Sequence, residues 1–350
     1  MAQKINCKDY SIFINEKSAL NDCVRQINPS SIFILSDENT AQFCLHQIYE
    51  TADFDFQTIT IKAGELNKTV DTAAYVWKKL MQKGADRKSL LINLGGGMVG
   101  DLGGFCASCY MRGIDFIQMP TSLLAQVDAA VGGKTGIDID HIKNVVGSFQ
   151  MPKAVIINTS FLSSLPYKEL LSGYAEMLKH GLIANESIWQ RLSGQTDIAS
   201  INFEEEIVQS IKIKQNIVDQ DPKESGLRKI LNFGHTIGHA LESANLGTES
   251  HLLHGEAIAI GMVAEAHLSK QQGLISASDY QSIKSSIKTL YGNRYKSVSS
   301  AEHLMPFMLK DKKNHLGDVK FVLLQSMGNA VYDIEATSEE IELAIEDYCV

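Results

Sequence analysis

Short apolar runs alternate with amphipathic segments over the first 160 residues, and this alternation constrains the fold more than any other feature of the chain. The runs are rich in β-branched residues and cover 31–37, 57–64, 89–97, 115–121 and 154–160. Such alternation is typical of a parallel sheet whose strands are joined by crossover helices. Several runs end in Gly, Asp or Thr, and open parallel sheets bind their ligands at the carboxyl ends of the strands.

Beyond Pro166 the pattern changes to long segments with helical spacing of the apolar residues. These segments cover 167–183, 204–220, 228–245 and 255–272. Near the end, two apolar runs flank Gly328 and Asn329, which predicts a small hairpin. We therefore expect two domains, an α/β domain over 1–165 and a mainly α-helical domain over 166–350, with a ligand site in the cleft between them.

Composition excludes several classes of protein. The net charge of the 350 residues is −9, which disfavours nonspecific binding to nucleic acid. No stretch reaches the roughly 18 uncharged apolar residues that span a bilayer, and the first residues lack the apolar core of a signal peptide. Cys106 and Cys109 form a single CxxC, so we expect reduced thiols that pack as small apolar groups. We predict a cytoplasmic protein that binds neither membrane nor nucleic acid.

A glycine-rich segment directly follows the third predicted strand. Gly95, Gly97 and Gly100 fit the pattern GxGxxG, in which a backbone approaches a pyrophosphate at a helix N-terminus. The pattern comes after two earlier strand and helix units, and the same glycines also suit tight packing of a helix on a sheet. The glycines alone leave both interpretations open.

Polar residues near the other predicted strands favour a nucleotide. Asp37 can accept a hydrogen bond from a ribose hydroxyl, and Glu65 and Lys68 follow the second strand. Lys134 lies in VGGKTG, which differs from a nucleoside-triphosphate loop because Asp128 stands where glycine is required. Lys134 can still meet a phosphate from this glycine turn as a point charge.

Four of the ten histidines fall between positions 235 and 254. An even spread would place about 0.6 histidine in 20 residues, and such clustering is typical of metal sites. His235 and His239 are one helical turn apart, but Thr236 between them excludes the metalloprotease pattern HExxH. We predict that part of the cluster, which also contains His251 and His254, binds a metal.

The spacing around this cluster predicts a shared helix face. Four polar residues are spaced four, three and four apart, namely Arg228, Asn232, His235 and His239. Gly234 and Gly238 would weaken such a helix, which favours a ligand that approaches its backbone closely. His254 begins an almost continuously apolar segment, so we expect it at the start of a second, buried helix.

A third metal ligand must come from outside the histidine cluster. The segment YAEMLKHG offers Glu176, Lys179 and His180. A carboxylate within an apolar helix is either paired with a cation or bound to a metal. The pattern alone does not choose between these two roles.

Seven motifs together resemble the 3-dehydroquinate synthase family of the sugar phosphate cyclase superfamily. They occur in order between about Asp37 and Asn314 and are GGGMVGDLGGFCASCYMRG, MPTSLLAQVDAAVGGKTGID, KNVVGSF, YAEMLKHGLI, GLRKILNFGHTIGHALE, LHGEAIAIGM and KDKKN. The resemblance implies a Rossmann-like α/β domain that holds NAD and a helical domain that holds zinc or cobalt. It also implies a sugar phosphate substrate, 3-deoxy-D-arabino-heptulosonate 7-phosphate, between the two domains.

The resemblance assigns cofactor roles residue by residue. The metal ligands would be Glu176, His235 and His254, with His239 as a catalytic neighbour. The residues that would contact NAD are Asp37, Glu65, Lys68, Gly96, Gly97, Asp101, Thr121, Ser122, Lys143 and Phe161.

Substrate roles follow in the same way. The substrate phosphate would meet Lys134, Asn144 and Lys312, although Lys313 is adjacent, with Arg112 supplied by the partner subunit of a homodimer. The carboxylate and ring hydroxyls would be held by Lys214, Arg228 and Asn232, and the catalytic group is completed by Asp128 and Lys179.

The implied reaction regenerates its cofactor. NAD takes a hydride from the C5 hydroxyl, phosphate leaves by elimination, and the hydride returns before ring opening and aldol closure yield 3-dehydroquinate. Alternatives are a sister cyclase that acts on sedoheptulose 7-phosphate or an amino substrate, a metal-dependent polyol dehydrogenase of related fold, and a noncatalytic binding module. The presence of Arg228, Asn232 and His239 favours the first-named family over the sister cyclases.

Overall fold

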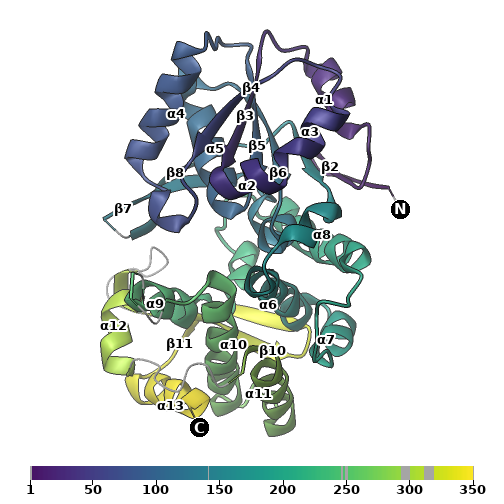
Figure 1. Ribbon diagram of the computed structural model, residues 1–350. Coiled ribbons are helices and arrows are strands. Elements are labelled where there is room, and N and C mark those ends of the chain that lie inside the picture. Colours follow the sequence, from purple (N-terminus) through teal and green to yellow (C-terminus); the bar gives the residue numbers. More distant parts are fainter. Residues whose placement is uncertain are drawn as a thin grey trace. The chain divides into compact units, whose positions relative to one another are not determined.

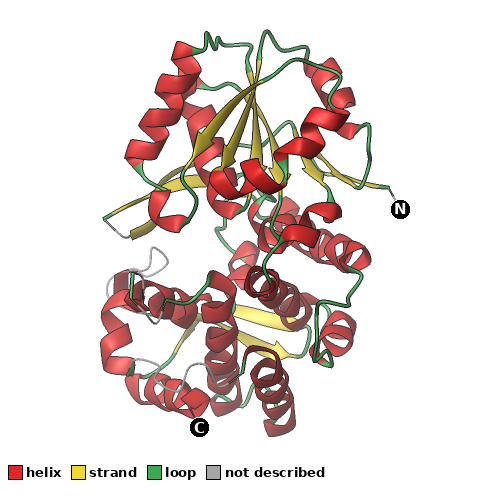
Figure 2. Ribbon diagram, in the orientation of Figure 1, coloured by secondary structure: helices red, strands yellow, loops and turns green. Residues whose placement is uncertain are grey.

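The computed structural model describes residues 2–140, 142–245, 247–248, 251–292, 300–310 and 319–349. The chain divides into two compact units, Met1–Pro166 and Tyr167–Val350. Figures 1 and 2 show that the first contains a sheet flanked by helices and the second is mainly helical with one small hairpin. The predicted α/β and helical fold classes are therefore confirmed. Within the described ranges, every helix is too short or too polar to cross a bilayer.

The first unit is built on a seven-stranded sheet with the order β1-β2-β9-β6-β5-β3-β4. All five predicted strands are present, as β3 (Ile32–Asp37), β4 (Gln57–Ile61), β5 (Leu90–Gly95), β6 (Asp115–Pro120) and β9 (Ala154–Ile157). Two further strands, β1 (Gln3–Asn6) and β2 (Ser11–Ile14), extend one edge. Neighbouring strands are parallel except for the antiparallel pair β1 and β2.

Helices cover both faces of this sheet. On one face α4 (Val70–Gln82) and α5 (Gly97–Cys109) pack on Phe33 and Leu35 of β3. On the other face α1 (Ala19–Ile27) and α3 (Leu45–Thr51) pack on Ile32 and Ile34. The alternate residues of β3 are all buried, which explains why the strand is a continuous apolar run.

A hairpin of β7 (Lys134–Ile139) and β8 (Ile142–Phe149) was not among the predicted strands. Its β8 strand is largely exposed, so it lacks the apolar alternation that reveals a half-buried strand. The predicted place of Lys134 within a glycine turn was wrong. The turn lies at Gly132 and Gly133, which have positive φ, and Lys134 is the first residue of β7.

The second unit is organised around α10 (His254–Gln271), which is buried on nearly every side. The other helices are α6 (Tyr167–Ala184), α7 (Glu186–Ser193), α8 (Phe203–Gln220), α9 (His235–Asn245), α11 (Ala277–Tyr291), α12 (Ala301–Lys310) and α13 (Ser338–Cys349). The predicted hairpin is present as β10 (Lys320–Ser326) and β11 (Asn329–Glu335), with its turn at Met327 and Gly328. His254 begins α10, as expected from the sequence.

The predicted single helix over 228–245 is wrong. Residues Leu227–Asn232 form a 3₁₀ helix, and α9 begins only after a break at Gly234, which has a φ of 79°. The sequence also suggested that a ligand approaches the backbone at Gly234 and Gly238. That prediction is wrong, because both glycines face α10. A Cβ on Gly234 would lie 2.9 Å from the backbone nitrogen of Met262, and one on Gly238 would lie 3.0 Å from the carbonyl oxygen of Ala257.

At two glycines of α10, the backbone of a neighbouring segment comes very close to the helix. A Cβ on Gly261 would lie 1.9 Å from the carbonyl oxygen of Gly234, ahead of α9. A Cβ on Gly255 would lie 2.0 Å from the carbonyl oxygen of Ser172 in α6. Since no side chain fits at either place, both neighbouring backbones can approach α10 directly.

Asp221 organises the loop between α8 and the 3₁₀ helix. Its carboxylate accepts hydrogen bonds from the backbone N–H groups of Ser225, Gly226 and Arg228, at 3.0, 2.7 and 3.1 Å. Desolvation acts against the charge, but the N–H donors outweigh it and lower the pKa of Asp221 from 3.8 to about 2. The ionised carboxylate therefore stabilises the path of the chain that leads to Arg228.

We expect Gly261→Ala to destabilise the protein, because the new methyl group would collide with the backbone beside α9. Overpacking of this kind costs about 1–3 kcal/mol or more, so the melting temperature should fall by at least about 2–4 °C in differential scanning calorimetry. Gly194→Ala is the matched control, since a Cβ there meets nothing within 4 Å and φ is −82°. Equal melting temperatures for the two variants would contradict the close crossing.

A second prediction concerns the stability of the protein at acidic pH. Because the folded-state pKa of Asp221 lies below its ordinary value, the carboxylate contributes stability above about pH 4, and this contribution is lost as pH falls through about 2. Asp221→Asn should lower the melting temperature by about 2–6 °C at pH 7, and the difference from wild type should narrow below pH 4. Thermal unfolding followed by circular dichroism across this range measures it. A difference that does not narrow would exclude ionisation of Asp221 as its source.

Candidate functional site

Side chains from three helices of the second unit converge at the predicted metal site. His235 is the first residue of α9, His254 is the first residue of α10, and Glu176 lies within α6. The Nε2 atoms of the two histidines each lie 3.6 Å from Oε1 of Glu176. Two imidazole nitrogens and a carboxylate oxygen form a ligand set typical of catalytic zinc sites. A small relaxation would bring all three within bonding distance of one divalent ion.

The other ring nitrogens of both histidines contact oxygen atoms. Nδ1 of His235 lies 3.1 Å from the carbonyl oxygen of Phe233, and Nδ1 of His254 lies 3.2 Å from Oε2 of Glu242. An N–H donated from Nδ1 would leave Nε2 as the lone-pair donor to a metal, as in many metal sites. Burial opposes the charge on His254, but Glu242 and Glu176 outweigh it and raise the pKa of this imidazole to about 9.

Glu176 combines the two roles between which the sequence could not choose. The residue is completely buried, and its Oε2 forms an ion pair with the equally buried Lys179. Its other oxygen faces the two imidazoles. One carboxylate can therefore be paired with a cation and still offer an atom to a metal.

His239 lies one turn beyond His235 on α9 and is half-buried. Its ring centroid is 5.1 Å from that of His235 and 5.8 Å from that of His254. Ligand atoms of the three histidines all lie within 4.8 Å of one another. The distances suit either a ligand or a close polar neighbour, so the role of His239 stays a prediction. His251 is exposed and does not belong to this group.

Two acidic residues of this site were not found from the sequence. Glu242 contacts His254, as described above. Glu265 of α10 is completely buried and accepts hydrogen bonds from the backbone N–H groups of Gly234 and Thr236, at 2.6 and 3.0 Å. The signal that singled out Glu176, an acidic residue within an apolar helix, is equally present at Glu265.

The predicted carboxylate- and hydroxyl-binding residues lie on α8 and on the 3₁₀ helix of the second unit. Lys214 and Arg228 are buried. Arg228 donates from Nη1 to the carbonyl oxygen of Pro222 at 2.7 Å, and Asn232 donates from Nδ2 to Oε1 of Glu224 at 2.8 Å. Lys312, predicted to meet the substrate phosphate, lies outside the described residues, as does Lys313.

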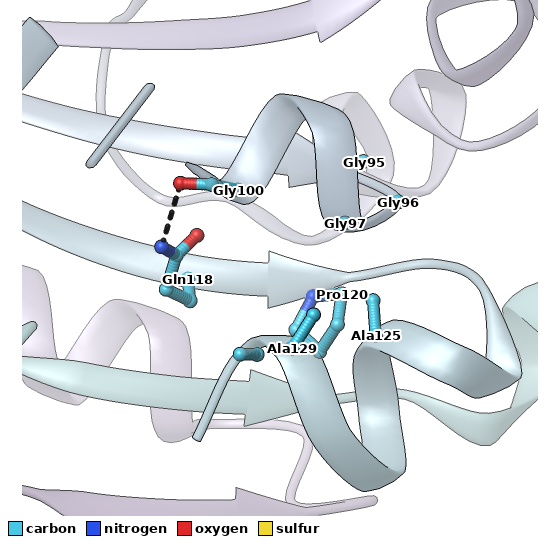
Figure 3. A pocket seen from close by; sticks show the side chains of 9 residues that line it. Gly95, Gly96, Gly97, Gly100, Gln118, Pro120, Ala125 and Ala129 are labelled. Atoms are coloured by element: carbon cyan, nitrogen blue, oxygen red, sulfur yellow. Dashed lines mark hydrogen bonds between the residues drawn. The ribbon is translucent and has the colours of Figure 1, made fainter. Parts of the chain in front are cut away.

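In the first unit a small pocket opens where β5 passes into α5. Figure 3 shows the turn of Gly95, Gly96 and Gly97 opposite Pro120 and neighbouring alanines. A Cβ on Gly97 would find its nearest neighbour, Ala129, at 3.4 Å, whereas one on Gly95 would lie 2.5 Å from Cβ of Val99. Internal packing thus explains Gly95, whereas a Cβ on Gly97 would make only an ordinary van der Waals contact.

Four of the residues predicted to contact NAD form one cluster. The buried Nζ of Lys68 lies 2.9 Å from Oδ2 of Asp101 and 3.3 Å from Oε1 of Glu65. Nζ of Lys143 lies 3.9 Å from the same oxygen of Glu65. Burial opposes the charge on Lys68, but Asp101, Glu65 and Asp138 outweigh it, so its pKa lies above the usual range.

The other predicted NAD contacts differ in their surroundings. Asp37 ends β3, and its Oδ1 accepts a hydrogen bond from the backbone N–H of Thr40 at 2.8 Å. Thr121 and Ser122 follow β6, with the N–H of Thr121 donating to the carbonyl oxygen of Gly95. Phe161 is 1% exposed and its ring packs in the apolar core, so its predicted contact with NAD finds no support from the ring.

The remaining predicted residues of the first unit lie on its hairpin and turns. Arg112 and Asn144 are exposed and have left-handed backbones, with φ of 69° and 50°. Lys134 is exposed at the start of β7. Asp128 lies in the short π-helical turn Ala125–Ala129.

Comparisons with known proteins agree over nearly the whole chain. A family model for the 3-dehydroquinate synthase N-terminal domain matches residues 58–172, and one for the C-terminal domain matches residues 173–314. A 3-dehydroquinate synthase of Parabacteroides distasonis is 40% identical over 345 residues, covering 98% of this chain and 96% of the relative.

Solved structures share the fold. A 2-epi-5-epi-valiolone synthase from Streptomyces hygroscopicus, solved with NAD+ and Zn2+, is similar with a TM-score of 0.88 at 24% identity and 99% coverage of both chains. A 2-deoxy-scyllo-inosose synthase with carbaglucose-6-phosphate, NAD+ and Co2+ gives a TM-score of 0.81 at 21% identity and the same coverage. On the family models and the close relative, the chain belongs to the 3-dehydroquinate synthase family.

Proposed function

We propose that this protein is a 3-dehydroquinate synthase, a phosphate-eliminating lyase that converts 3-deoxy-D-arabino-heptulosonate 7-phosphate into 3-dehydroquinate and phosphate. NAD and a divalent metal, zinc or cobalt, are its cofactors. The observation that carries the proposal is the convergence of Glu176, His235 and His254 in a chain of this family. The first domain, over 1–165, would bind NAD, and the second, over 166–350, would bind metal and substrate.

The chain's own residues prepare the metal site. Bound metal would supply a Lewis acid for substrate oxygens, and bound NAD would supply a hydride acceptor. Glu176, His235 and His254 would hold the metal, and Glu242 fixes the imidazole of His254 through Nδ1. Lys179 forms an ion pair with the other oxygen of Glu176. His239 is close enough to this group to exchange a proton with a bound substrate.

The proposed substrate carries a phosphate and a carboxylate, and cationic side chains suit both. We assign the phosphate to Lys134 and Asn144, with Lys312 as a further contact. The planar guanidinium of Arg228 matches a carboxylate, and the hydrogen bond to Pro222 holds it in one orientation. Lys214 and Asn232 would hold hydroxyl groups. Asp128 completes the catalytic set.

A sister sugar-phosphate cyclase is the nearest alternative function. The two solved cyclases share the fold at 24% and 21% identity, and this likeness shows the fold alone. Identity favours dehydroquinate synthase, since the curated relative is 40% identical and the valiolone synthase 24%. A polyol dehydrogenase of related fold would release NADH, and the turnover experiment below separates it from both cyclases.

We further propose a homodimer that works in the cytoplasm. The β7 and β8 hairpin exposes apolar side chains that a partner could cover, namely Ile139, Ile142, Val145, Val146 and Phe149. Arg112 is exposed on the same unit, and we assign it to the partner's site.

The proposed reaction predicts a specific balance of products. With catalytic NAD, the protein should release one phosphate per sugar phosphate consumed and accumulate no NADH. Thorough removal of metal by a chelator should abolish release, and added Zn2+ or Co2+ should restore it. Phosphate and NADH are measured in the same sample. Accumulation of NADH from a simple alcohol without phosphate release would refute the synthase and favour a dehydrogenase.

The proposed ligands predict a difference between two nearby histidines. His254→Ala removes a ligand, so Co2+ affinity and activity should both fall by more than the roughly 10- to 100-fold cost of losing an outer contact. His251→Ala is the matched control and should bind Co2+ normally, because His251 is exposed and does not belong to the group of His235, His239 and His254. Titration with Co2+ followed by its visible absorption reports affinity directly. Unchanged binding by the His254 variant would remove this residue from the ligand set.

A further inference from the structure

Asp138, to which the family resemblance gives no role, joins two segments that carry proposed ligand-binding residues. Its Oδ1 accepts a hydrogen bond from the backbone N–H of Asn144 at 2.7 Å. Its own backbone N–H donates to the carbonyl oxygen of Lys68 at 2.8 Å, and it forms an isolated parallel bridge with Thr69. The side chain of Asp138 is 14% exposed, whereas Asn144 is exposed.

The hairpin has an irregularity at this place. Ile137 pairs with Val146 and Ile139 pairs with Ile142, so Asp138 lies opposite residues 143–145. Asn144, inside this bulge, has a φ of 50°, which is unfavourable for most residues with a side chain. Regular pairing does not hold its N–H, and the carboxylate of Asp138 replaces the missing partner.

The oxygen of Asp138 that accepts from Asn144 also lies near Lys68. Nζ of Lys68 lies 3.9 Å from Oδ1 of Asp138, beyond its closer contacts with Asp101 and Glu65. The backbone bond between Lys68 and Asp138 does not depend on the side chain. Loss of the carboxylate therefore removes the support of Asn144 and leaves most contacts of Lys68 in place.

We infer that Asp138 is a positioning residue for the phosphate subsite, which holds the bulge of β8 so that Asn144 meets the substrate phosphate. The inference rests on the proposed function, because that function assigns the phosphate to Asn144. Asp138 itself contacts neither the proposed metal ligands nor the glycine turn among the interactions of the described residues. Asp138 would affect substrate binding only by positioning the backbone of Asn144.

Two substitutions separate positioning from charge. Asp138→Ala removes the acceptor, whereas Asp138→Asn removes the charge and keeps an oxygen that accepts the N–H of Asn144. In Asp138→Ala we expect the KM for the sugar phosphate to rise about tenfold or more, with kcat changed less than about threefold. Asp138→Asn should restore the KM to within about threefold of wild type.

Amide hydrogen exchange tests the same inference without turnover. In Asp138→Ala the N–H of Asn144 should exchange about tenfold faster or more, and in Asp138→Asn it should remain protected. Asp140→Asn is the matched control: it removes an exposed charge from the same hairpin, at a φ of 49° that asparagine tolerates, and should match wild type in both experiments.

The outcomes are distinct. Unchanged KM and exchange in Asp138→Ala would overturn the inference. Equal damage in the Ala and Asn variants, with lower melting temperatures and no separation of KM from kcat, would overturn it in favour of a general structural role. If the wild-type protein releases no phosphate, the proposed function fails. Exchange at Asn144 would still decide whether Asp138 holds the bulge.

Discussion

The second unit depends on the direct backbone contacts of α10 with its two neighbours. Gly255 lets α10 touch α6 beside Ser172, one turn from Glu176. Gly261 lets it touch the chain at Gly234, just before α9 begins with His235. Because both contacts involve backbone atoms, they leave little freedom for the helices to slide. The two histidine rings are thereby held with their centroids 5.4 Å apart, close to the carboxylate from α6.

In both units, buried charged side chains are paired with groups of opposite charge. In the first, the Nζ of Lys68 is surrounded by carboxylates, with Asp101 and Glu65 the nearest. In the second, Glu176 is matched by Lys179 and faces two imidazoles. An unpaired buried charge would cost several kcal/mol, so each group is stable only as part of its set. Local pairing of this kind lets both units hold buried lysines without an uncompensated charge.

The sequence predicted features that depend on local periodicity and missed those that depend on distant contacts. The five parallel strands and the start of α10 at His254 follow from apolar runs within single segments. The break at Gly234 did not, because the spacing of Arg228, Asn232 and His235 fits an unbroken helix equally well. The reason for the break is the close approach of α10, which is remote in sequence. Glu242 was missed for the same reason, whereas Glu265 carries the same local signal as Glu176, an acidic residue within an apolar helix. Glu176 was assigned as a ligand only through family resemblance, since the pattern around it allowed two roles.

The position of both proposed histidine ligands at the first residue of a helix has an electrostatic consequence. The N-terminus of a helix carries a partial positive charge and favours anions. Two such termini, those of α9 and α10, meet beside the imidazoles and repel any cation held there. The carboxylates of Glu176 and Glu242 offset this repulsion. Carboxylates also cap both termini directly, since Glu265 accepts from the N–H groups of Gly234 and Thr236 and Glu256 accepts from that of Leu253. The two helix starts are therefore neutralised locally, which suits the proposed binding of a cation between them.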